Sequence, residues 1–256
     1  MKNKLWTHDE LILALNLYLK LPFGKLHSGT PEIIHLATII GRTAGSVAMR
    51  LNNFASVDPF HQQRGVIGLQ GGKKQVEPIW DEFINNKENL LFESERILAE
   101  KEQNTIEVKY AEILSGTEDL KGETKLREVK TRVNQNVFRQ IVVANYNGKC
   151  AITGMDIPGL LIASHIIPWS KNENERLNPQ NGIAINALHD KAFDNGLLTI
   201  TPDFKIKISP ILKKQTKSEV INDYFLKYEN KPIFLPTRFF PDVEFLKYHN
   251  QERFKS

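Results

Sequence analysis

Residues 160–196 read LLIASHIIPWSKNENERLNPQNGIAINALHDKAFDNG. The segment opens with an apolar, strand-like run that ends at His165. A polar stretch from Ser170 to Asn178 follows, and Asn181-Gly182 then precedes a helix-like run from Ile183 to Phe193. We therefore expect a strand, a polar loop and a helix in close succession.

Two carboxylates are placed regularly on the predicted helix. Asp190 and Asp194 lie four positions apart, so both side chains should face the same side. Carboxylate oxygens are ligands of hard cations such as Mg²⁺. A solvated acidic helix end has the same spacing, but Ala192 and Phe193 between the two aspartates indicate that this helix packs against a core.

Several blocks in this half of the chain resemble the HNH (ββα-metal) endonuclease family. The resemblance is to the branch without zinc-binding cysteines, which is common in bacterial restriction and anti-phage proteins. It extends from about Arg132 to Phe254. The blocks that carry it are Gln135-x-x-Phe138-Arg139, Cys150-Ala151-Ile152-Thr153-Gly154, Ser164-His165-Ile166-Ile167-Pro168, Asn181-Gly182 and His189-Asp190-Lys191-Ala192-Phe193-Asp194-Asn195-Gly196.

The resemblance implies a metal-dependent DNA endonuclease in restriction or phage defence. Phosphodiester hydrolysis needs a water deprotonated near neutral pH and a cation that neutralises the transition state. Histidine accepts such a proton without a large pKa shift. By resemblance, His165 is the general base and Asn181 braces the metal-binding loop. Asp190 and Asp194 then hold one divalent ion per site, Mg²⁺ or Mn²⁺.

The sequence leaves open whether His189 or Asp190 is a metal ligand. The family's last histidine can be placed at position 189 or at the next one. One residue turns a helix by about 100°, so His189 and Asp190 do not both point at one ion. We favour Asp190 as the ligand, with a catalytic role for His189 in contacting the scissile phosphate or bracing the site.

Two positions depart from the wider family pattern. Ser164 stands where many relatives have a metal-binding Asp or His, so we expect only two protein ligands and weak metal affinity without DNA. Thr153 replaces the second cysteine of the zinc-bearing relatives, and Cys150 is the only cysteine in the chain. No structural zinc is therefore expected.

The first 56 residues predict a small helical domain. Thr7 and Glu10 form a capping-box pattern, and helices are expected up to Lys20, after Thr30-Pro31 and after Thr43. Trp6-Thr7 and the stretch from Gly41 to Val47 resemble Myb/SANT-like helix-turn-helix modules. A packing or dimerisation domain has the same pattern. The expected DNA contacts are Arg42, Ser46, Arg50 and Asn53 here, and Arg139 and Lys191 in the C-terminal half.

Charge divides the chain into three segments. Residues 1–74 carry 9 Lys or Arg and 4 Asp or Glu, residues 75–125 carry 6 and 13, and residues 126–256 carry 19 and 13. We expect an α+β chain with a helix-turn-helix-like DNA-binding domain at 1–56, a loop and acidic helical connector at 57–125, and the HNH nuclease domain with a C-terminal extension at 126–256.

The expected partners follow from this reading. No apolar run approaches the roughly 18 residues that cross a bilayer, and the N-terminus lacks a signal-peptide pattern, so a cytoplasmic protein without membrane contact is expected. The substrate is DNA rather than a small molecule, and cutting both strands favours a homodimer. Two alternatives stay open: a DNA-binding regulator with a degenerate HNH fold, and an HNH nuclease that acts on RNA.

Overall fold

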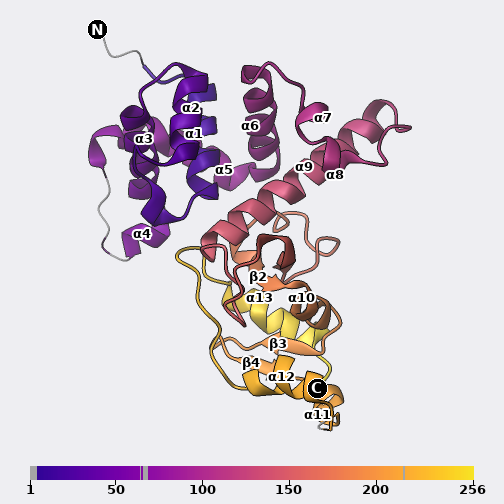
Figure 1. The fold of residues 1–256 in the computed structure, drawn as a ribbon. Helices are drawn as coiled ribbons and strands as arrows, with labels where there is room; N and C mark the ends of the chain where they lie inside the picture. Colours follow the sequence, from indigo (N-terminus) through magenta and orange to yellow (C-terminus); the bar gives the residue numbers. More distant parts are fainter. Residues whose placement is uncertain (1–4, 64, 66–68, 216) are drawn as a thin grey trace. The chain divides into compact units, whose positions relative to one another are not determined.

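The computed structural model describes residues 5–63, 65, 69–215 and 217–256. The chain forms two compact units, an N-terminal unit up to Val137 and a C-terminal unit from Phe138 (Figure 1). The border lies inside helix α9, which extends from Gly122 to Asn145. The functional division at residues 56 and 125 remains a prediction.

The described residues of the N-terminal unit form helices joined by short loops. Two single 3-10 turns lie at Phe23–Lys25 and Gln70–Gly72. The helices are α1 (His8–Lys20), α2 (Pro31–Ile40), α3 (Ala44–Val57), α4 (Pro59–Gln63), α5 (Lys73–Asn85), α6 (Lys87–Lys101), α7 (Ile106–Lys109), α8 (Ala111–Leu114) and the first part of α9.

The first three helices confirm the predicted boundaries. Thr7 caps α1 and forms the full capping box with Glu10. Gly41 ends α2 in the left-handed conformation with φ of 66°, and the Thr43 side chain caps α3 by accepting from Ser46 N. The all-round apolar character of α1 is explained by its position, because α2, α3, α5 and α6 all pack against it.

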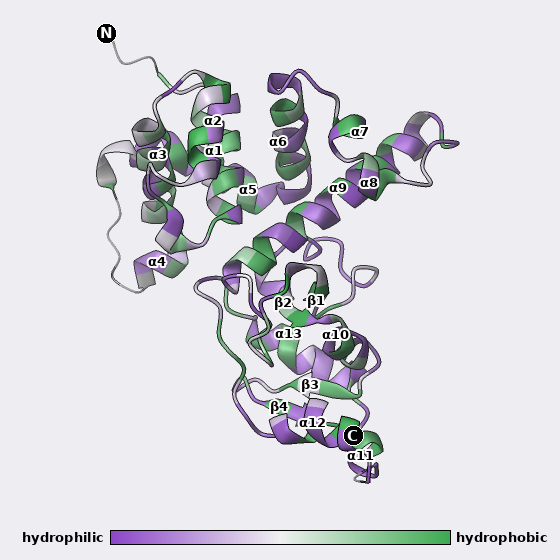
Figure 2. Cartoon of the chain, in the orientation of Figure 1, coloured by the Kyte–Doolittle hydropathy of each residue, from purple (hydrophilic) through white to green (hydrophobic). Residues whose placement is uncertain are grey.

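The segment after α3 contains more helix than the sequence indicated. Part of the predicted loop and connector at 57–125 lies outside the described residues, but α4 occupies 59–63 and α5 begins at Lys73. Residues 111–125 include α8 and the start of α9. Helix α9 extends towards the N-terminus as far as Gly122, and Val129, Val133 and Val137 lie on its buried face. Figure 2 shows the alternation of hydrophilic and hydrophobic residues along α9.

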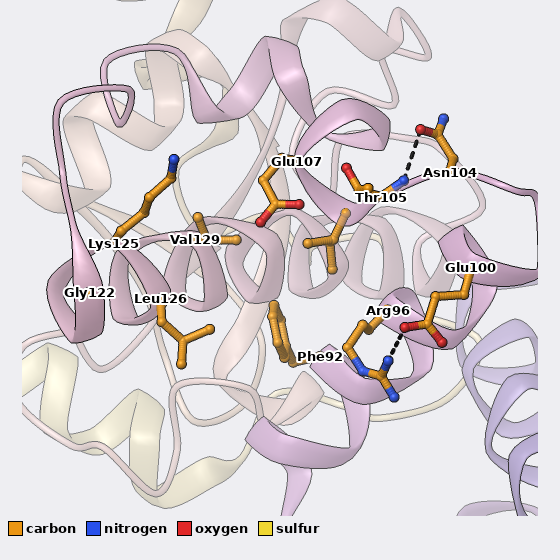
Figure 3. A pocket seen from close by; sticks show the side chains of 11 residues that line it. Phe92, Arg96, Glu100, Asn104, Thr105, Glu107, Gly122, Lys125, Leu126 and Val129 are labelled. Carbon is orange, nitrogen blue, oxygen red and sulfur yellow. Dashed lines mark hydrogen bonds and ion pairs between the residues drawn. The ribbon is translucent and has the colours of Figure 1, made fainter.

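A pocket of about 390 Å³ lies between α6, α7 and the first turns of α9 (Figure 3). Phe92, Leu126 and Val129 supply apolar lining, and Arg96 and Glu100 form an ion pair on its wall. Arg96 also pairs with Glu93, so two carboxylates neutralise this guanidinium. The pocket therefore offers no unbalanced positive charge from Arg96.

The C-terminal unit combines short strands with short helices. A 3-10 turn at Pro158–Leu160 precedes β1, another at Pro179–Asn181 precedes β2, and a π-helical turn at His249–Arg253 follows α13. After the end of α9, the order is β1 (Leu161–His165), β2 (Gly182–Asn186), α10 (Ala187–Asp194), β3 (Leu198–Ile200), β4 (Ile206–Ile208), α11 (Pro210–Lys213), α12 (Glu219–Tyr224), a 3-10 turn (Leu226–Tyr228) and α13 (Val243–Tyr248).

Strands β1 and β2 pair antiparallel, and α10 packs against both of them. His165 lies opposite Gly182 in this register. The expected helix from Ile183 is wrong in its first residues, because Gly182–Asn186 is a strand and α10 begins at Ala187. A short apolar run suits either structure, and pairing with β1 decides in favour of the strand. The result is the ββα arrangement that the resemblance implied.

Gly182 allows α9 to approach this hairpin closely. A Cβ atom at this position would lie 2.4 Å from Val142 Cγ2 and 2.8 Å from Phe138 Cζ. Any larger residue would therefore push the end of α9 away from β2. Gly182 thus allows Phe138 of α9 to lie close to β2, at the position that pairs with His165 of β1.

The fold class is α+β, as predicted. The core of the C-terminal unit includes Phe138, Ile141, Cys150, Ile152 and Ile166, which are all buried, whereas Trp169 is half-buried. In the tail, strands β3 and β4 pair antiparallel. Within the described part of the chain, every helix is too short or too polar to span a lipid bilayer.

Candidate active site

The ring of His165, at the end of β1, is held between aromatic side chains. It stacks on Phe138 with centroids 4.1 Å apart and planes inclined by 13°, and Trp169 meets it edge-on at 5.5 Å. Nε2 lies 2.9 Å from the carbonyl oxygen of Arg176. A carbonyl only accepts, so Nε2 carries the hydrogen and Nδ1 keeps the lone pair.

Burial lowers the pKa of His165, while the Arg176 carbonyl and the charge of Asp194 oppose that shift. The imidazole is therefore neutral near pH 7. A neutral ring with a defined tautomer is the form that accepts a proton from water.

Two aspartates of α10 face the same region. Asp190 is half-buried and Asp194 is exposed. Burial raises the pKa of Asp190, the Ser164 hydroxyl lowers it, and the negative charge of Asp194 raises it further. Since Asp194 acts on both Asp190 and His165, the three titratable groups share one electrostatic environment.

Ser164 is the residue of β1 that lies next to Asp190. Its side chain is 2% exposed, and its Oγ atom has no hydrogen-bond partner of ordinary geometry in the described structure. It is nevertheless close enough to lower the pKa of Asp190. The buried Ser164 hydroxyl therefore has the Asp190 carboxylate as its polar neighbour, and it stabilises the ionised form of that carboxylate.

The donor set is small. Nowhere in the described residues do three His, Cys, Asp or Glu side chains gather closely enough to hold one metal ion. Asp190 and Asp194 remain as two carboxylates whose like charges repel. Two such groups fit a hard divalent cation that keeps further oxygen ligands from outside the protein.

Asn181 holds the loop that leads away from β1. Its Oδ1 accepts from Ile167 N at 2.8 Å, and its Nδ2 donates to the carbonyls of Ile167 and Glu175 at 3.1 and 3.0 Å. The side chain is 1% exposed. These bonds fix the loop whose Arg176 carbonyl orients His165, so Asn181 acts on the histidine through the backbone.

His189 points into the core. It is 1% exposed, its Nδ1 accepts from Asn186 Nδ2 at 2.9 Å, and its Nε2 donates to the Tyr224 carbonyl at 2.5 Å. Phe225 and Tyr228 meet its ring edge-on. Both ring nitrogens are thus engaged within the protein, and the structure does not bring His189 together with His165.

The residues expected to contact DNA differ in their surroundings. Lys191 is exposed, but Arg139 donates to the carbonyls of Pro158 and Leu161 at 2.8 and 3.1 Å. In the N-terminal unit, Asn53 is 4% exposed and donates to the Leu69 carbonyl. Arg42, Ser46 and Arg50 line one hollow of about 490 Å³ beside α3.

Sequence reasoning missed the backbone atoms that orient the two histidines. The carbonyls of Arg176 and Tyr224 perform this task, and every residue type offers a carbonyl. The sequence places Phe138 in a family motif and in the packed core, but it does not indicate that Phe138 stacks on His165. Its distance from His165 depends on how α9 packs, which no spacing reveals.

Comparison with known proteins gives one family. Residues 150–201 match the family model described as HNH endonuclease, and they contain His165, Asn181, Asp190 and Asp194. The chain gives no match among curated proteins. The matched segment includes β1, β2 and α10, which form the ββα unit described above. This segment of the chain is therefore similar to the HNH endonucleases in both sequence and ββα arrangement.

Proposed function

We propose that this protein is a metal-dependent DNA endonuclease with His165 as its general base. The observation that carries the proposal is the shared environment of His165, Asp190 and Asp194 within an HNH nuclease domain. A proton acceptor and two cation ligands side by side are the groups that phosphodiester hydrolysis requires.

His165 accepts the proton of the attacking water on Nδ1. The Arg176 carbonyl holds the Nε2 hydrogen and so keeps the ring in the required tautomer. The charge of Asp194 stabilises the imidazolium that forms. Phe138 and Trp169 restrict the ring orientation from two sides. Asn181 supports this arrangement by holding the loop that carries the carbonyl.

Asp190 and Asp194 would hold one divalent ion, Mg²⁺ or Mn²⁺. HNH nucleases generally use a divalent metal ion, which supplies positive charge for the scissile phosphate and the leaving oxygen. The fit rests on two like-charged carboxylates, one of which lies beside the buried Ser164 hydroxyl. His189 is a positioning residue in this proposal, because its hydrogen bond to the Tyr224 carbonyl joins α10 to the last residue of α12.

An HNH domain implies a nucleic acid substrate, and we propose double-stranded DNA. Support comes from the excess of basic residues in segments 1–74 and 126–256. The helix-turn-helix-like domain at 1–56 supplies binding, the acidic connector spans 57–125, and residues 126–256 supply the chemistry. On the resemblance alone, we also propose that the protein is a homodimer in the bacterial cytoplasm and acts in restriction or phage defence.

Incubation of purified protein with supercoiled plasmid and Mg²⁺ or Mn²⁺ tests the function. We expect nicked or linear product that EDTA abolishes and that His165→Ala removes. Tight DNA binding without cleavage in either metal would instead indicate a regulator with a degenerate nuclease fold. A parallel digestion of RNA of matched length decides the substrate, since an RNA nuclease would leave the plasmid intact.

A further inference from the structure

A hollow in the N-terminal unit lies between the segment before α1 and the first turns of α3. Its volume is about 490 Å³. Thr43, Gly45 and Met49 are exposed, so the hollow opens to solvent. Its lining residues are Leu5, Trp6, Arg42, Thr43, Gly45, Ser46, Met49, Arg50 and Gln75.

Two guanidinium groups lie over the same indole ring in this hollow. The Cζ atom of Arg42 is 4.4 Å from the Trp6 ring centroid, and that of Arg50 is 4.9 Å from it. Cation–π contacts of this kind fix the plane of a guanidinium group. Both arginines are thus held in place before any ligand binds.

The two arginines differ in how their charge is balanced. Arg42 forms an ion pair with Glu10, with Nη2 and Oε2 2.7 Å apart. Arg50 has no carboxylate partner within the described part of the chain, and its Nε atom is buried without a hydrogen-bond partner there. Among the described residues, Arg50 donates one hydrogen bond, from Nη1 to the Gly72 carbonyl, and that bond is long at 3.5 Å.

An unbalanced positive charge therefore remains in the hollow. Burial and the nearby charge of Arg42 both lower the pKa of Arg50, which means that its cationic form is held at a cost. The Arg96 pocket of the same unit shows the contrast, because two glutamates neutralise that guanidinium. An anion bound beside Arg50 would remove the imbalance.

The first turn of α3 adds a neutral donor to the same place, because Ser46 lines the hollow and its hydroxyl can donate. The Ser46 N–H is already used, since it donates to the Thr43 hydroxyl at 3.1 Å. Gly45 lines the hollow, and a Cβ atom built on it meets nothing within 4 Å. The partial positive charge of a helix N-terminus favours a negatively charged group in such a space.

We propose that this hollow binds one phosphate group of a DNA strand, with Arg50 as the principal ligand. A guanidinium fork, a hydroxyl and a helix N-terminus together match a phosphate better than an isolated carboxylate of a protein partner. The inference rests on the proposed function in that it takes DNA as the substrate. Of the residues expected to contact DNA in this unit, it retains Arg50 and Ser46. It excludes Asn53, which is buried and donates to the Leu69 carbonyl.

Binding of a fluorescent 20-base-pair duplex in EDTA tests the site without cleavage. We expect Arg50→Ala to raise the Kd about tenfold and to reduce the slope of log K against log salt by about one. Gly45→Glu places a carboxylate in the open space and should weaken binding similarly. Gly24→Glu adds the same charge at an exposed glycine outside the hollow, so it is the matched control and should bind as the unchanged chain does.

Two further outcomes separate this inference from the proposed function. If Arg50→Ala and Gly45→Glu both bind the duplex with unchanged Kd while plasmid cleavage persists, the phosphate site is wrong and the nuclease stands. If both variants lose affinity but no chain cuts DNA in Mg²⁺ or Mn²⁺, the site stands without the nuclease. Calorimetric titration with inorganic phosphate distinguishes a free anion: Arg50-dependent phosphate binding with unchanged duplex affinity overturns the DNA assignment.

Discussion

The imidazole of His165 stacks on the phenyl ring of Phe138, with centroids 4.1 Å apart and planes 13° from parallel. Phe138 belongs to α9, whereas His165 ends β1. The contact therefore joins the helix that crosses the border between the two units to the candidate base. It restrains the imidazole plane, while the Arg176 carbonyl restrains rotation within that plane.

Removing the base and removing its support should have different effects. We expect His165→Ala to lower the rate of plasmid cleavage by about 10²–10⁴-fold with duplex binding unchanged. Phe138→Leu keeps most of the volume but removes the stacking surface, so cleavage should fall about tenfold at saturating DNA. The matched control is Phe83→Leu, which alters an equally buried phenylalanine of α5. Equal cleavage by the two leucine variants would show that Phe138 contributes only to packing.

The carboxylates of α10 are tested by their amides and by a control one position away. Asp190→Asn should abolish cleavage, and duplex binding should survive or tighten because a negative charge near the phosphate is gone. Asp194→Asn should be similar or milder, and raised Mn²⁺ should restore part of the activity. Without DNA, calorimetric titration of the unchanged chain with Mn²⁺ should show weak binding, because only two protein ligands are present.

His189 distinguishes the two registers. His189→Ala removes hydrogen bonds to Asn186 and Tyr224, so it should lower the free energy of unfolding by about 1–3 kcal/mol. The folded fraction should still cut plasmid in Mg²⁺. Loss of metal-dependent cleavage by folded His189→Ala, together with full activity of Asp190→Asn, would assign the ligand to His189.

Local signals predicted much of this fold. The Thr7–Glu10 capping box, Gly41 at the end of α2 and the β1 strand up to His165 all depend on residues within a few positions of each other. The four-residue spacing of Asp190 and Asp194 is local in the same sense. Such features can be predicted from the sequence because both interacting residues lie within one or two turns of each other in the chain.

Features that depend on residues far apart in the sequence could not be predicted from it. The run at 183–186 becomes a strand because β1 pairs with it. The inward orientation of His189 depends on the Tyr224 carbonyl, 35 positions away. Likewise, Asn53 had the helical spacing of a DNA contact, but Leu69 engages its amide.

A buried histidine in the C-terminal unit makes stability depend on pH. His249 stacks on Phe193 with centroids 3.7 Å apart, accepts from Thr199 on Nδ1 and donates from Nε2 to the Phe193 carbonyl. Burial and the positive charge of Arg253 lower the pKa of His249 to about 4, although the hydrogen bond to the Phe193 carbonyl acts to raise it. In the unfolded chain its pKa is about 6.5.

Below pH 6.5 the unfolded chain therefore binds a proton at His249 that the folded chain does not bind. Stability should fall by about 1.4 kcal/mol per pH unit between about 6.5 and 4, relative to His249→Gln, which cannot titrate there. Urea unfolding at several pH values, followed by circular dichroism, measures the difference between the two chains. Parallel profiles for the two chains would contradict this origin of the pH dependence.

The N-terminal unit contains a buried carboxylate that should also lose its stabilising effect as the pH falls, but in a more acidic range. Glu95 is 1% exposed, and Lys20, Asn16 and Tyr110 donate hydrogen bonds to it. Burial alone would raise the pKa of Glu95, but the charge of Lys20 and these hydrogen bonds lower it to about 2. Its stabilising effect is therefore complete above pH 4.5 and is lost as the pH falls towards 2.

We expect Glu95→Gln to lower the free energy of unfolding of this unit by about 3–5 kcal/mol at pH 7, because the Lys20 ammonium loses its buried counter-charge. Glu100→Gln, which removes an exposed partner of Arg96 on the same helix, should cost less than about 1 kcal/mol.

Urea unfolding followed by tryptophan fluorescence in a Trp169→Phe background reports on Trp6 and Trp80. The double variant Lys20→Met, Glu95→Gln should recover part of the loss, because no buried charge remains. If Glu95→Gln alone unfolds at the same urea concentration as the unchanged chain, the ion pair does not stabilise the packing of α1 against α6.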